Sequence, residues 1–402
     1  MLCQFTFKNF KSYKNETVFD CQAASLPEFH DSLFSTPGSK TDILPLSVIY
    51  GPNGGGKSNL LEAMACLIST VVNPIHELKK NRCETVLQQT AHVSSFAFDE
   101  NSRLLPTEFQ IYFRIQDYEY RYYLAIYQDT IRGEDLSRKK VNAKKSAQIF
   151  SRDDNDIVLG AMLKKKNINT DVNPKMPFLS FLAINYNIPV IADVQTWFES
   201  CIIRNFANYK SELTILYTPN ELFKKQVLHL LNDMDIDISD YRIDSERRIY
   251  TQRIINNRSF ELPLEAESDG TTKLICILPI ILLALHEGRL LIMDELDAKL
   301  HPKLLRYVIS LFRNPKINKH NAQLLFTAHD ISIMKNTVFR RDEIWFASEN
   351  EHHESEIYSL YEIRQENHSR INNTAAYDKQ YLEGRYGADP YLRNMLDGSD
   401  WQ

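Results

Sequence analysis

Alternating apolar and polar positions open the chain and return in its second quarter. "QFTFKNF" near the N-terminus shows this period of two, and so do "FAFDE", "TEFQIYFRI" and "YEYRYYLAIY" further along. Gln116 and Asp117 separate the last two runs as a turn. A period of two is typical of strands with one buried face. The pattern therefore predicts an antiparallel sheet.

Continuous apolar runs alternate with helical periods at both ends of the chain. "LSVIY", "RLLIM" and "AQLLF" are typical of buried strands, and helical periods follow "GGGKS", "AESDG" and "LHP". Strands separated by helices on both sides of a long insertion predict an α/β fold whose sheet is split in sequence but joined in space. The fold class is therefore a mixed sheet with an antiparallel β-subdomain.

The middle of the chain has a different character. "RGEDLSRKKVNAKKSAQIFSRDDND" and "LKKKNINTD" are charged and poor in core residues, which favours loops or a mobile arm. "VIADVQTWFESCIIRNF" and "PNELFKKQVLHLLNDMD" have helical periodicity. We predict three parts: residues 1–130, an inserted helical lobe at 131–245, and residues 246–402.

Composition narrows the class of protein. The 402 residues are 43% hydrophobic and 25% charged, as in globular proteins, and a net charge of −5 argues against a surface wrapped in nucleic acid. The basic string "SRKKVNAKK" could bind nucleic acid or a protein partner, or form a solvated loop. The first residues do not resemble a signal peptide, and the longest apolar run, Leu274–Leu285, is too short to span a membrane. We predict a cytoplasmic protein without a membrane partner.

A glycine-rich string predicts a phosphate-binding loop. "GPNGGGKS" fits G-x-x-x-x-G-K-[ST] between a buried strand and a helix. Backbone N–H groups of such a loop point at phosphate oxygens, Lys57 reaches the β- and γ-phosphates, and Ser58 offers a hydroxyl to Mg²⁺. The predicted ATP-binding residues here are Gly51, Pro52, Asn53, Gly54, Gly55, Gly56, Lys57, Ser58 and Asn59.

Acidic and imidazole side chains end two of the buried strands. Asp294 and Glu295 follow "LLIM", where Asp294 would hold Mg²⁺ through water and Glu295 would polarise an attacking water. An exposed acidic turn is the alternative. His329 ends "LLFTAH", where a γ-phosphate sensor would lie, and a structural histidine is the alternative.

A helix start at Ser268 offers a second candidate for anion binding. A serine that caps a helix, with free N–H groups behind it, can receive an anion, although a plain N-cap has the same sequence. Asp269 adds negative charge at this position, which could bond to backbone or to Lys273.

These strings together resemble a known family. "FKNFKSYKNETV", the phosphate loop, "SDG", "DELD" followed by "LHP", and "TAHD" resemble ABC-type ATPases of the SMC/RecF/OLD group. "ESDGTTKL", "DELDAKLHPKLL", "FRRDEIWF" and "YLEGRYGADPYL" look more narrowly like the RloA/AbiL-type ATPases of phage-defence operons.

The resemblance implies how two chains share ATP. Ser268 and the Gly270 amide, with Asp269 between them, would contact the γ-phosphate held by the phosphate loop of another copy in a head-to-tail dimer or higher oligomer. Lys11 and Ser12 would lie near the base or phosphate, with a surface lysine as the alternative. His301 stands where relatives usually have an aspartate. Gln88 and Gln89 are candidates for the glutamine that senses Mg²⁺.

The resemblance also implies a role. We expect an ATP-hydrolysing sensor or regulator in antiviral defence that controls a separately encoded effector, such as a nuclease or toxin; the alternative is a RecF/SMC-like ATPase of DNA repair or maintenance. Only about seventy residues follow His329, too few for the nuclease domain of OLD proteins. Among them, "GRYGADP" favours a tight fold-back in which Arg385 could contact an anion or an interface.

Overall fold

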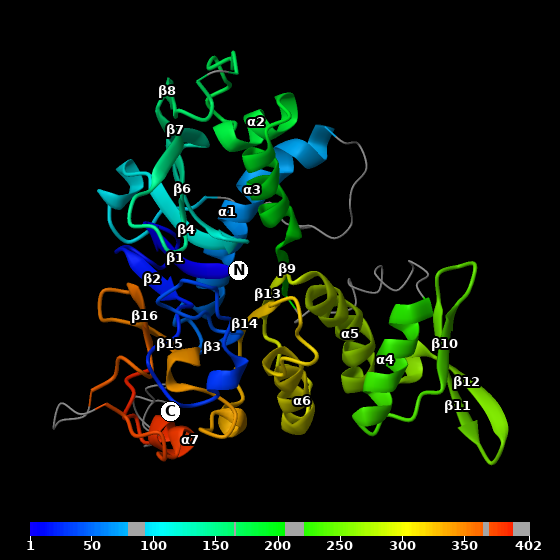
Figure 1. The fold of residues 1–402 in the computed structure, drawn as a ribbon. Coiled ribbons are helices and arrows are strands. Elements are labelled where there is room, and N and C mark those ends of the chain that lie inside the picture. The colour runs from blue at the N-terminus through cyan, green and yellow to red at the C-terminus, as the bar shows by residue number, and fades with distance from the viewer. Residues whose placement is uncertain (79–92, 165, 206–220, 365–369, 389–402) are drawn as a thin grey trace, which may run out of the picture.

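The computed structural model describes residues 1–78, 93–164, 166–205, 221–364 and 370–388. Figure 1 shows a body of two sheets with helices between and beside them, and an arm at its right-hand side. The α-helices are α1 (Lys57–Leu78), α2 (Phe178–Asn185), α3 (Pro189–Ser200), α4 (Glu221–Asp233), α5 (Asp269–Glu287), α6 (Pro302–Arg313) and α7 (Tyr377–Leu382).

A six-stranded sheet forms the centre of the fold, and its order mixes both ends of the chain. All neighbours are parallel except the antiparallel pair β15–β16, so the predicted split sheet is confirmed. In sheet order the strands are β16 (Ser355–Ser359), β15 (Ile344–Glu349), β3 (Leu46–Tyr50), β14 (Gln323–Thr327), β13 (Leu290–Asp294) and β9 (Ile202–Asn205).

The two faces of this sheet bury different cores. Val48 and Phe326 belong to the core formed with α4, α5 and α6, whereas Ile49 and Leu325 belong to the core formed with α1 and the second sheet. Successive residues of a strand point to opposite faces. The three inner strands β3, β14 and β13 are buried throughout and mostly apolar, which is typical of parallel sheets covered on both faces.

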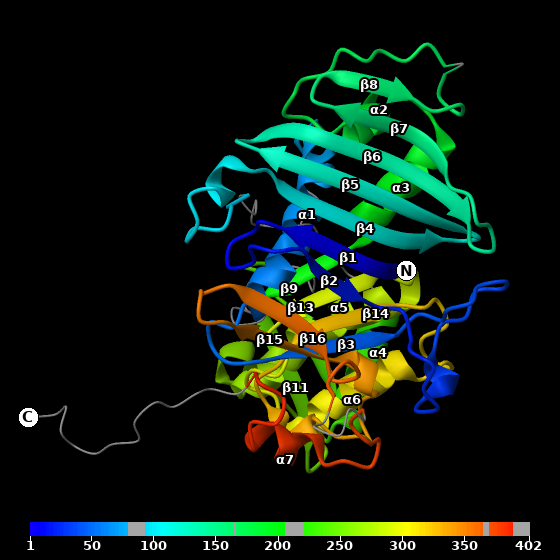
Figure 2. The same ribbon diagram turned by 90° about the vertical axis from the view of Figure 1, so that its left-hand side faces the viewer.

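A seven-stranded antiparallel sheet covers α1, α2 and α3 (Figure 2). The alternating strings at 107–115 and 118–127 form neighbouring strands, as predicted, but residues 96–100 ("FAFDE") form no strand. In sheet order the strands are β2 (Thr17–Asp20), β1 (Leu2–Lys8), β4 (Thr107–Ile115), β5 (Tyr118–Tyr127), β6 (Thr130–Lys140), β7 (Ala147–Asp153) and β8 (Asp156–Leu159).

The prediction of loops or a mobile arm is wrong for residues 130–159, because β6, β7 and β8 continue the antiparallel sheet there. The described residues of "LKKKNINTD" form no helix or strand, as predicted. Glu134 explains the error. It occupies a fully buried position of β6, where the alternation would otherwise carry an apolar residue. Its carboxylate accepts hydrogen bonds from the N–H groups of Phe178 (2.5 Å) and Leu179 (2.9 Å) at the start of α2, and from the Tyr122 hydroxyl (2.9 Å).

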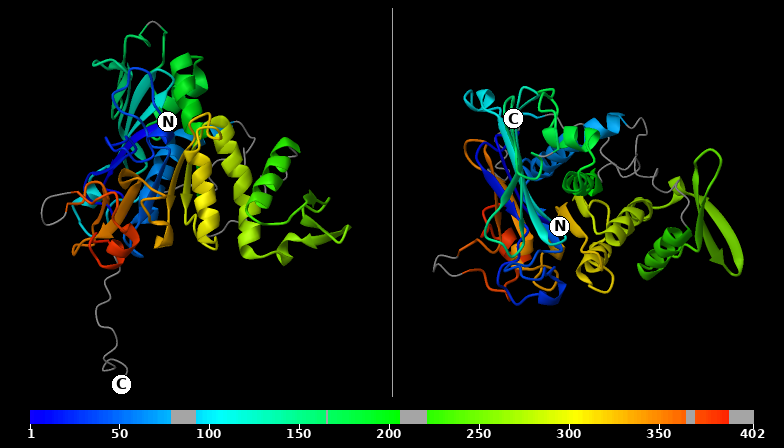
Figure 3. Two further views of the ribbon diagram at one scale, coloured as in Figure 1. Left: turned by 60° about the horizontal axis from the view of Figure 1, so that its bottom comes forward. Right: turned by 45° about the horizontal axis from the view of Figure 1, so that its top comes forward.

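The inserted segment carries the predicted helices but is not wholly helical. "IIRN", expected as the end of a helix, forms β9 and pairs with β13 in the central sheet. The helix α4 and a three-stranded sheet form the projecting arm seen in both views of Figure 3. Its strands are β10 (Asp240–Ile243), β11 (Ile249–Ile255) and β12 (Arg258–Pro263). The domain boundaries at 130 and 245 stay predictions.

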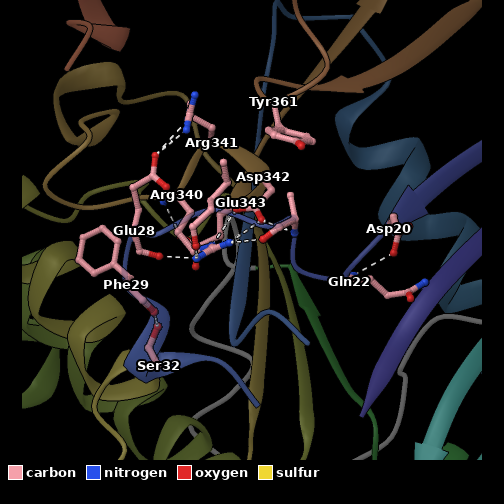
Figure 4. A network of polar contacts seen from close by, with 12 residues as sticks. Asp20, Gln22, Glu28, Phe29, Ser32, Arg340, Arg341, Asp342, Glu343 and Tyr361 are labelled. Atoms are coloured by element: carbon pink, nitrogen blue, oxygen red, sulfur yellow. Dashed lines mark hydrogen bonds and ion pairs between the residues drawn. The ribbon is translucent and has the colours of Figure 1, made fainter. Parts of the chain in front are cut away.

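Buried charge fixes the connection between β2 and β3 to the last quarter of the chain (Figure 4). The fully buried guanidinium of Arg340 donates to both carboxylate oxygens of Asp342, at 2.9 and 2.8 Å, and to backbone carbonyls of Ala24 and Glu28. Arg341 pairs with the Glu28 carboxylate at 2.8 Å. Charged hydrogen bonds that satisfy one another make such burial tolerable. The string "FRRDE" is therefore part of the structural frame.

Two helices, α1 and α5, are long and apolar enough to cross a membrane by length and composition. Most of the apolar stretch of each lies inside the fold, between the sheets in the case of α1 and beneath the central sheet in the case of α5. Burial of this kind is typical of core helices in globular proteins.

Candidate functional site

One edge of the central sheet gathers the predicted chemistry. β3, β14 and β13 are adjacent and parallel, so their carboxyl ends meet at the same edge. The phosphate loop follows β3, His329 follows β14, and Glu295 follows β13. Ligands of open α/β sheets bind at this edge.

The phosphate loop is shaped by glycines that have no room for a side chain. A Cβ at Gly51 would lie 2.1 Å from the Ala347 carbonyl oxygen, and one at Gly56 would lie 2.5 Å from Ser355 Oγ. Both glycines also have positive φ, +146° and +100°. Glycine at these positions allows the loop to lie directly against β15 and β16.

Lys57 begins α1 and turns its side chain back over the loop. Its ammonium donates to the carbonyl oxygens of Gly51 (2.8 Å) and Pro52 (2.9 Å), and the residue is 6% exposed. Burial lowers the pKa of Lys57, and the carboxylates of Asp294, Asp297 and Glu295 oppose that shift. Lys57 therefore lies within electrostatic reach of the acids that follow β13.

The N-terminal segment clasps the same loop. The Tyr13 hydroxyl donates to the Gly56 carbonyl at 3.1 Å, and Ser12 Oγ accepts from the Asn59 amide at 2.8 Å. Ser355 donates its hydroxyl to Ser12 Oγ (2.8 Å) and its N–H to the Ser12 carbonyl (2.7 Å). Ser12 thus lies beside the phosphate loop through its contact with α1, while Lys11 forms an ion pair with Glu62, one turn further along the helix.

Thr327 joins the two predicted acids. Its hydroxyl donates to Asp294 Oδ1 at 2.6 Å and accepts from the Glu295 N–H at 2.8 Å, and Thr327 is fully buried. Asn205 on β9 donates to the other Asp294 oxygen at 3.3 Å. These contacts fix the direction of the Asp294 carboxylate and the backbone of Glu295, whose own φ of 54° is left-handed.

Asp297 holds the residues that follow β14. Its Oδ2 accepts from the N–H groups of His329 (2.7 Å) and Asp330 (2.6 Å), and Asp297 is 8% exposed. The His329 side chain is exposed at the edge. The backbone of the predicted sensor is therefore anchored while its imidazole remains accessible.

Oxygen atoms at this edge suit Mg²⁺. Ser58 is exposed at the start of α1, and Asp294 presents a carboxylate from β13. Within the described ranges no group of three or more His, Cys, Asp or Glu side chains forms a protein-only metal site. A hard cation held by one or two protein oxygens together with phosphate and water fits the usual magnesium sites of nucleotide-binding proteins.

The second predicted half-site lies at the start of α5. Ser268 is the N-cap, and its Oγ accepts from the Thr271 N–H at 3.1 Å. Asp269 accepts from Lys299 at 2.8 Å, so its ion-pair partner is Lys299 and not Lys273. Ser268 and Asp269 are exposed. The capping geometry predicted for Ser268 is therefore present.

The remaining candidates have structural partners or lie outside the described residues. His301 caps α6, where its Nδ1 accepts from the Lys303 N–H at 3.2 Å. Arg385 forms an ion pair with Glu383 at 2.7 Å, and the fold-back around it seats Tyr386 against β15 and β16. Gln88 and Gln89 lie outside the described residues.

Comparison with known families decides the class of protein. A family model described as "AAA domain, putative AbiEii toxin, Type IV TA system" matches residues 46–161 and 164–335. The chain belongs to this family. The match covers the phosphate loop, the Ser268 segment, the carboxylate strand and His329. The chain thus contains an AAA domain, and its fold is the mixed α/β fold with an antiparallel sheet that its motifs predicted.

Similarity to individual proteins is weaker. The head of an SMC protein bound to the C-winged helix domain of ScpA has 14% identity and a TM-score of 0.40, over 89% of this chain and 97% of that one. CbiO1 from Clostridium perfringens, part of the ABC transporter complex CbiONQ, has 11% identity and a TM-score of 0.32, over 87% and 86%. Neither adds to what the sheet order shows. No curated protein matches the AAA domain.

Sequence reasoning missed three residues of this edge. Thr327 and Asp297 stood inside quoted strings, "TAHD" and "DELD", but only the sheet register shows what they bridge. Lys273 was considered only as a partner for Asp269. It is fully buried instead and donates to backbone carbonyls after β13. A lysine within the apolar face of a helix was the available signal.

Proposed function

We propose that this AAA domain binds ATP with Mg²⁺ and hydrolyses it in sites completed by a second copy. The observation that supports this best is the convergence of Lys57, the Asp294–Thr327 pair and Glu295 at one sheet edge. Bound Mg²⁺ would neutralise charge on the phosphates and be held by Ser58 and by Asp294, partly through water. Lys57 would exchange its loop carbonyls for phosphate oxygens.

Glu295 would act as the general base in this proposal. Its backbone is fixed by Thr327, so the carboxylate is aimed from a defined position at the sheet edge. It would orient a water and accept its proton while the water attacks the γ-phosphorus and the bond to the bridging oxygen breaks. His329, with its backbone anchored by Asp297, would contact the γ-phosphate.

The exposed Ser268 segment would supply the contact from the second copy. A helix N-terminus attracts anions through its free N–H groups and dipole. Ser268 and the Gly270 amide would bind the γ-phosphate held by the other copy's phosphate loop. Asp269 is compatible with this because its charge is balanced by Lys299.

The biological role we propose is control of a separately encoded effector, such as a nuclease or toxin, during phage infection. The description of the family as a toxin–antitoxin domain and the resemblance of the C-terminal strings to RloA/AbiL-type ATPases support this. The dimer would close when ATP binds and open after hydrolysis. The surface that it offers to the effector would then differ between the two states.

A mixing experiment tests the shared site. Ser268→Arg and Glu295→Gln chains should each hydrolyse ATP poorly alone, because one lacks the donated half-site and the other the base. A mixed dimer contains one site with Glu295 from one chain and Ser268 from the other, so roughly one site per mixed dimer is intact. Phosphate release should rise above that of either variant at the same total concentration. An active wild type whose variants show no recovery on mixing would contradict the shared site.

A further inference from the structure

Lys273 is a charged residue on the buried face of α5. It is fully buried, and its ammonium donates to the carbonyl oxygens of Glu295 (3.0 Å) and Ala298 (2.7 Å). These carbonyls are 22 and 25 residues further along the chain, on the segment that leaves β13. Lys273 therefore ties the first turns of α5 to the segment that carries the proposed base.

The contact falls on the peptide that follows Glu295. Glu295 has a left-handed backbone, φ 54°, which is unfavourable for a residue with a side chain and persists only where the surroundings hold it. Thr327 Oγ1 holds the N–H of Glu295 at 2.8 Å, and Lys273 holds its carbonyl. The two contacts clamp Glu295 from both sides.

A second set of contacts joins the same two segments at the surface. Lys299 pairs with Asp269 at 2.8 Å, and a Cβ at Gly270 would lie 3.1 Å from the Lys299 carbonyl oxygen. The helix start and residues 295–299 thus pack as one unit. A displacement of the Ser268 segment would be passed to Glu295 through the buried contact of Lys273.

Packing alone does not explain a lysine here. Burying an ammonium is costly, and a methionine fills nearly the same volume without charge. The lysine supplies something that an apolar residue cannot: a donor that reaches two carbonyls of another segment at once. One of these two carbonyls is that of Glu295, and the other, Ala298, lies three residues further on.

We propose that Lys273 is a positioning residue that couples the Ser268 segment of each subunit to the Glu295 of the same subunit. This inference rests on the proposed function above. Suppose that ATP bound to the first subunit contacts the Ser268 segment of the second subunit. Lys273 of the second subunit then passes this contact to the Glu295 of that same subunit, which serves the other ATP site. The two ATP sites of a dimer would then be linked. The single intact site of a mixed Ser268→Arg/Glu295→Gln dimer would therefore turn over, but more slowly than a site of the wild-type dimer.

The test compares Lys273→Met with Lys299→Met. Both remove an ammonium that links the same two segments, but only the first touches Glu295. Lys273→Met should lower kcat for ATP hydrolysis by at least about tenfold, since small misplacement of a reacting group has effects of this size. Its Kd for ATP, measured with the full chain, should stay within about threefold because Lys57 is untouched. Lys299→Met should change both much less.

Lys273→Arg adds a rescue arm, because an arginine keeps donors toward the carbonyls and should recover part of the kcat that methionine loses. A Lys273→Met chain that melts like the wild type and turns over at the wild-type rate would overturn the inference. Parallel loss of binding, turnover and melting temperature in Lys273→Met and in Lys273→Gln would also overturn it, since that pattern is structural. Absence of hydrolysis in the wild type contradicts instead the proposed function.

Discussion

Two buried lysines, Lys57 and Lys273, show how differently the two halves of the site are built. Each ammonium donates to a pair of backbone carbonyls at 2.7–3.0 Å. Lys57 holds carbonyls of its own loop, five and six residues away, at the edge that we propose binds phosphate. Lys273 holds carbonyls of a distant segment and is fully enclosed. In the proposed function the first lysine exchanges its carbonyls for phosphate, whereas the second keeps its carbonyls and positions Glu295.

The surroundings of the two lysines differ in the same sense. The phosphate loop is held in place by the rest of the chain, because Tyr13, Ala347 and Ser355 pack against its glycines. The Ser268 segment is backed by Lys273 and Lys299 but exposes Ser268 and Asp269. This difference agrees with the proposed head-to-tail pairing, in which the Ser268 segment would complete the site of another copy.

The largest effect should come from the exchangeable lysine. Lys57→Ala removes a charged donor to phosphate, and charge-assisted hydrogen bonds are the strong ones. We expect ATP affinity to fall by about a thousandfold, or roughly 4 kcal/mol, in a calorimetric titration. Lys14→Ala is the control, because it removes a lysine ammonium that pairs with Glu354. Tight ATP binding by Lys57→Ala would show that the phosphate loop is not the ATP-binding site.

A smaller effect is expected for Lys273, the enclosed lysine, whose contribution to stability should depend on pH. Burial lowers the pKa of Lys273 from 10.5 to about 8, although Asp297 and Glu295 oppose the shift. Between pH 8 and 10.5 the unfolded chain therefore binds more protons at this residue than the folded chain does, so its contribution to stability rises with pH. The wild type minus Lys273→Met difference in the free energy of unfolding should therefore increase by up to about 3 kcal/mol between pH 8 and 10.5.

Denaturant titrations of both chains at pH 7.5, 9 and 10.5 measure this difference, in which all other groups cancel. Lys299→Met serves as the control for loss of an exposed lysine that links the same two segments. A flat difference for Lys273→Met would mean that the Lys273 ammonium is not confined as the structure shows.

The smallest effect is expected for Thr327, which contacts neither lysine in the hydrogen bonds described above. Thr327 holds the N–H of Glu295, whereas Lys273 holds its carbonyl. Thr327→Val keeps the shape and removes the hydroxyl that bridges Asp294 and the Glu295 N–H. We expect kcat to fall about tenfold, which corresponds to about 1.4 kcal/mol. Thr327→Ser keeps the hydroxyl and should retain most of the rate in a steady-state phosphate assay. Equal rates for valine and serine would show that the hydroxyl does not position the base.

Local strings were enough to predict the finished half of the site. The phosphate loop and the Asp294–Glu295 pair each lie directly at the end of a buried strand in sequence, so their own strings identify them, although distant partners such as Ala347 and Thr327 set their geometry. Glu134 and Lys273 defeated the same reasoning for one physical reason: each is a charged residue in a buried position. Glu134 is satisfied by the start of α2, and Lys273 by carbonyls beyond β13. Partners so far away in sequence cannot be inferred from spacing.

The two remaining gaps in prediction are of another kind. The sheet order places β14 between β3 and β13, and only this order reveals Thr327 as the bridge between the acids. The Ser268 segment was identified correctly as a helix cap, and its role in a second copy's site stays a prediction because a cap and a half-site have the same local geometry.

The position of β3 in the central sheet also bears on how the chain is made. Its two neighbours, β14 and β15, are synthesised almost 300 residues later and end at Glu349. During translation the strand that carries the phosphate loop therefore waits without partners until most of the chain has left the ribosome, and pairing across such a separation is slow. The nucleotide site can assemble only after synthesis is nearly complete, so a truncated chain would carry the full phosphate-loop sequence and still have no ATPase site.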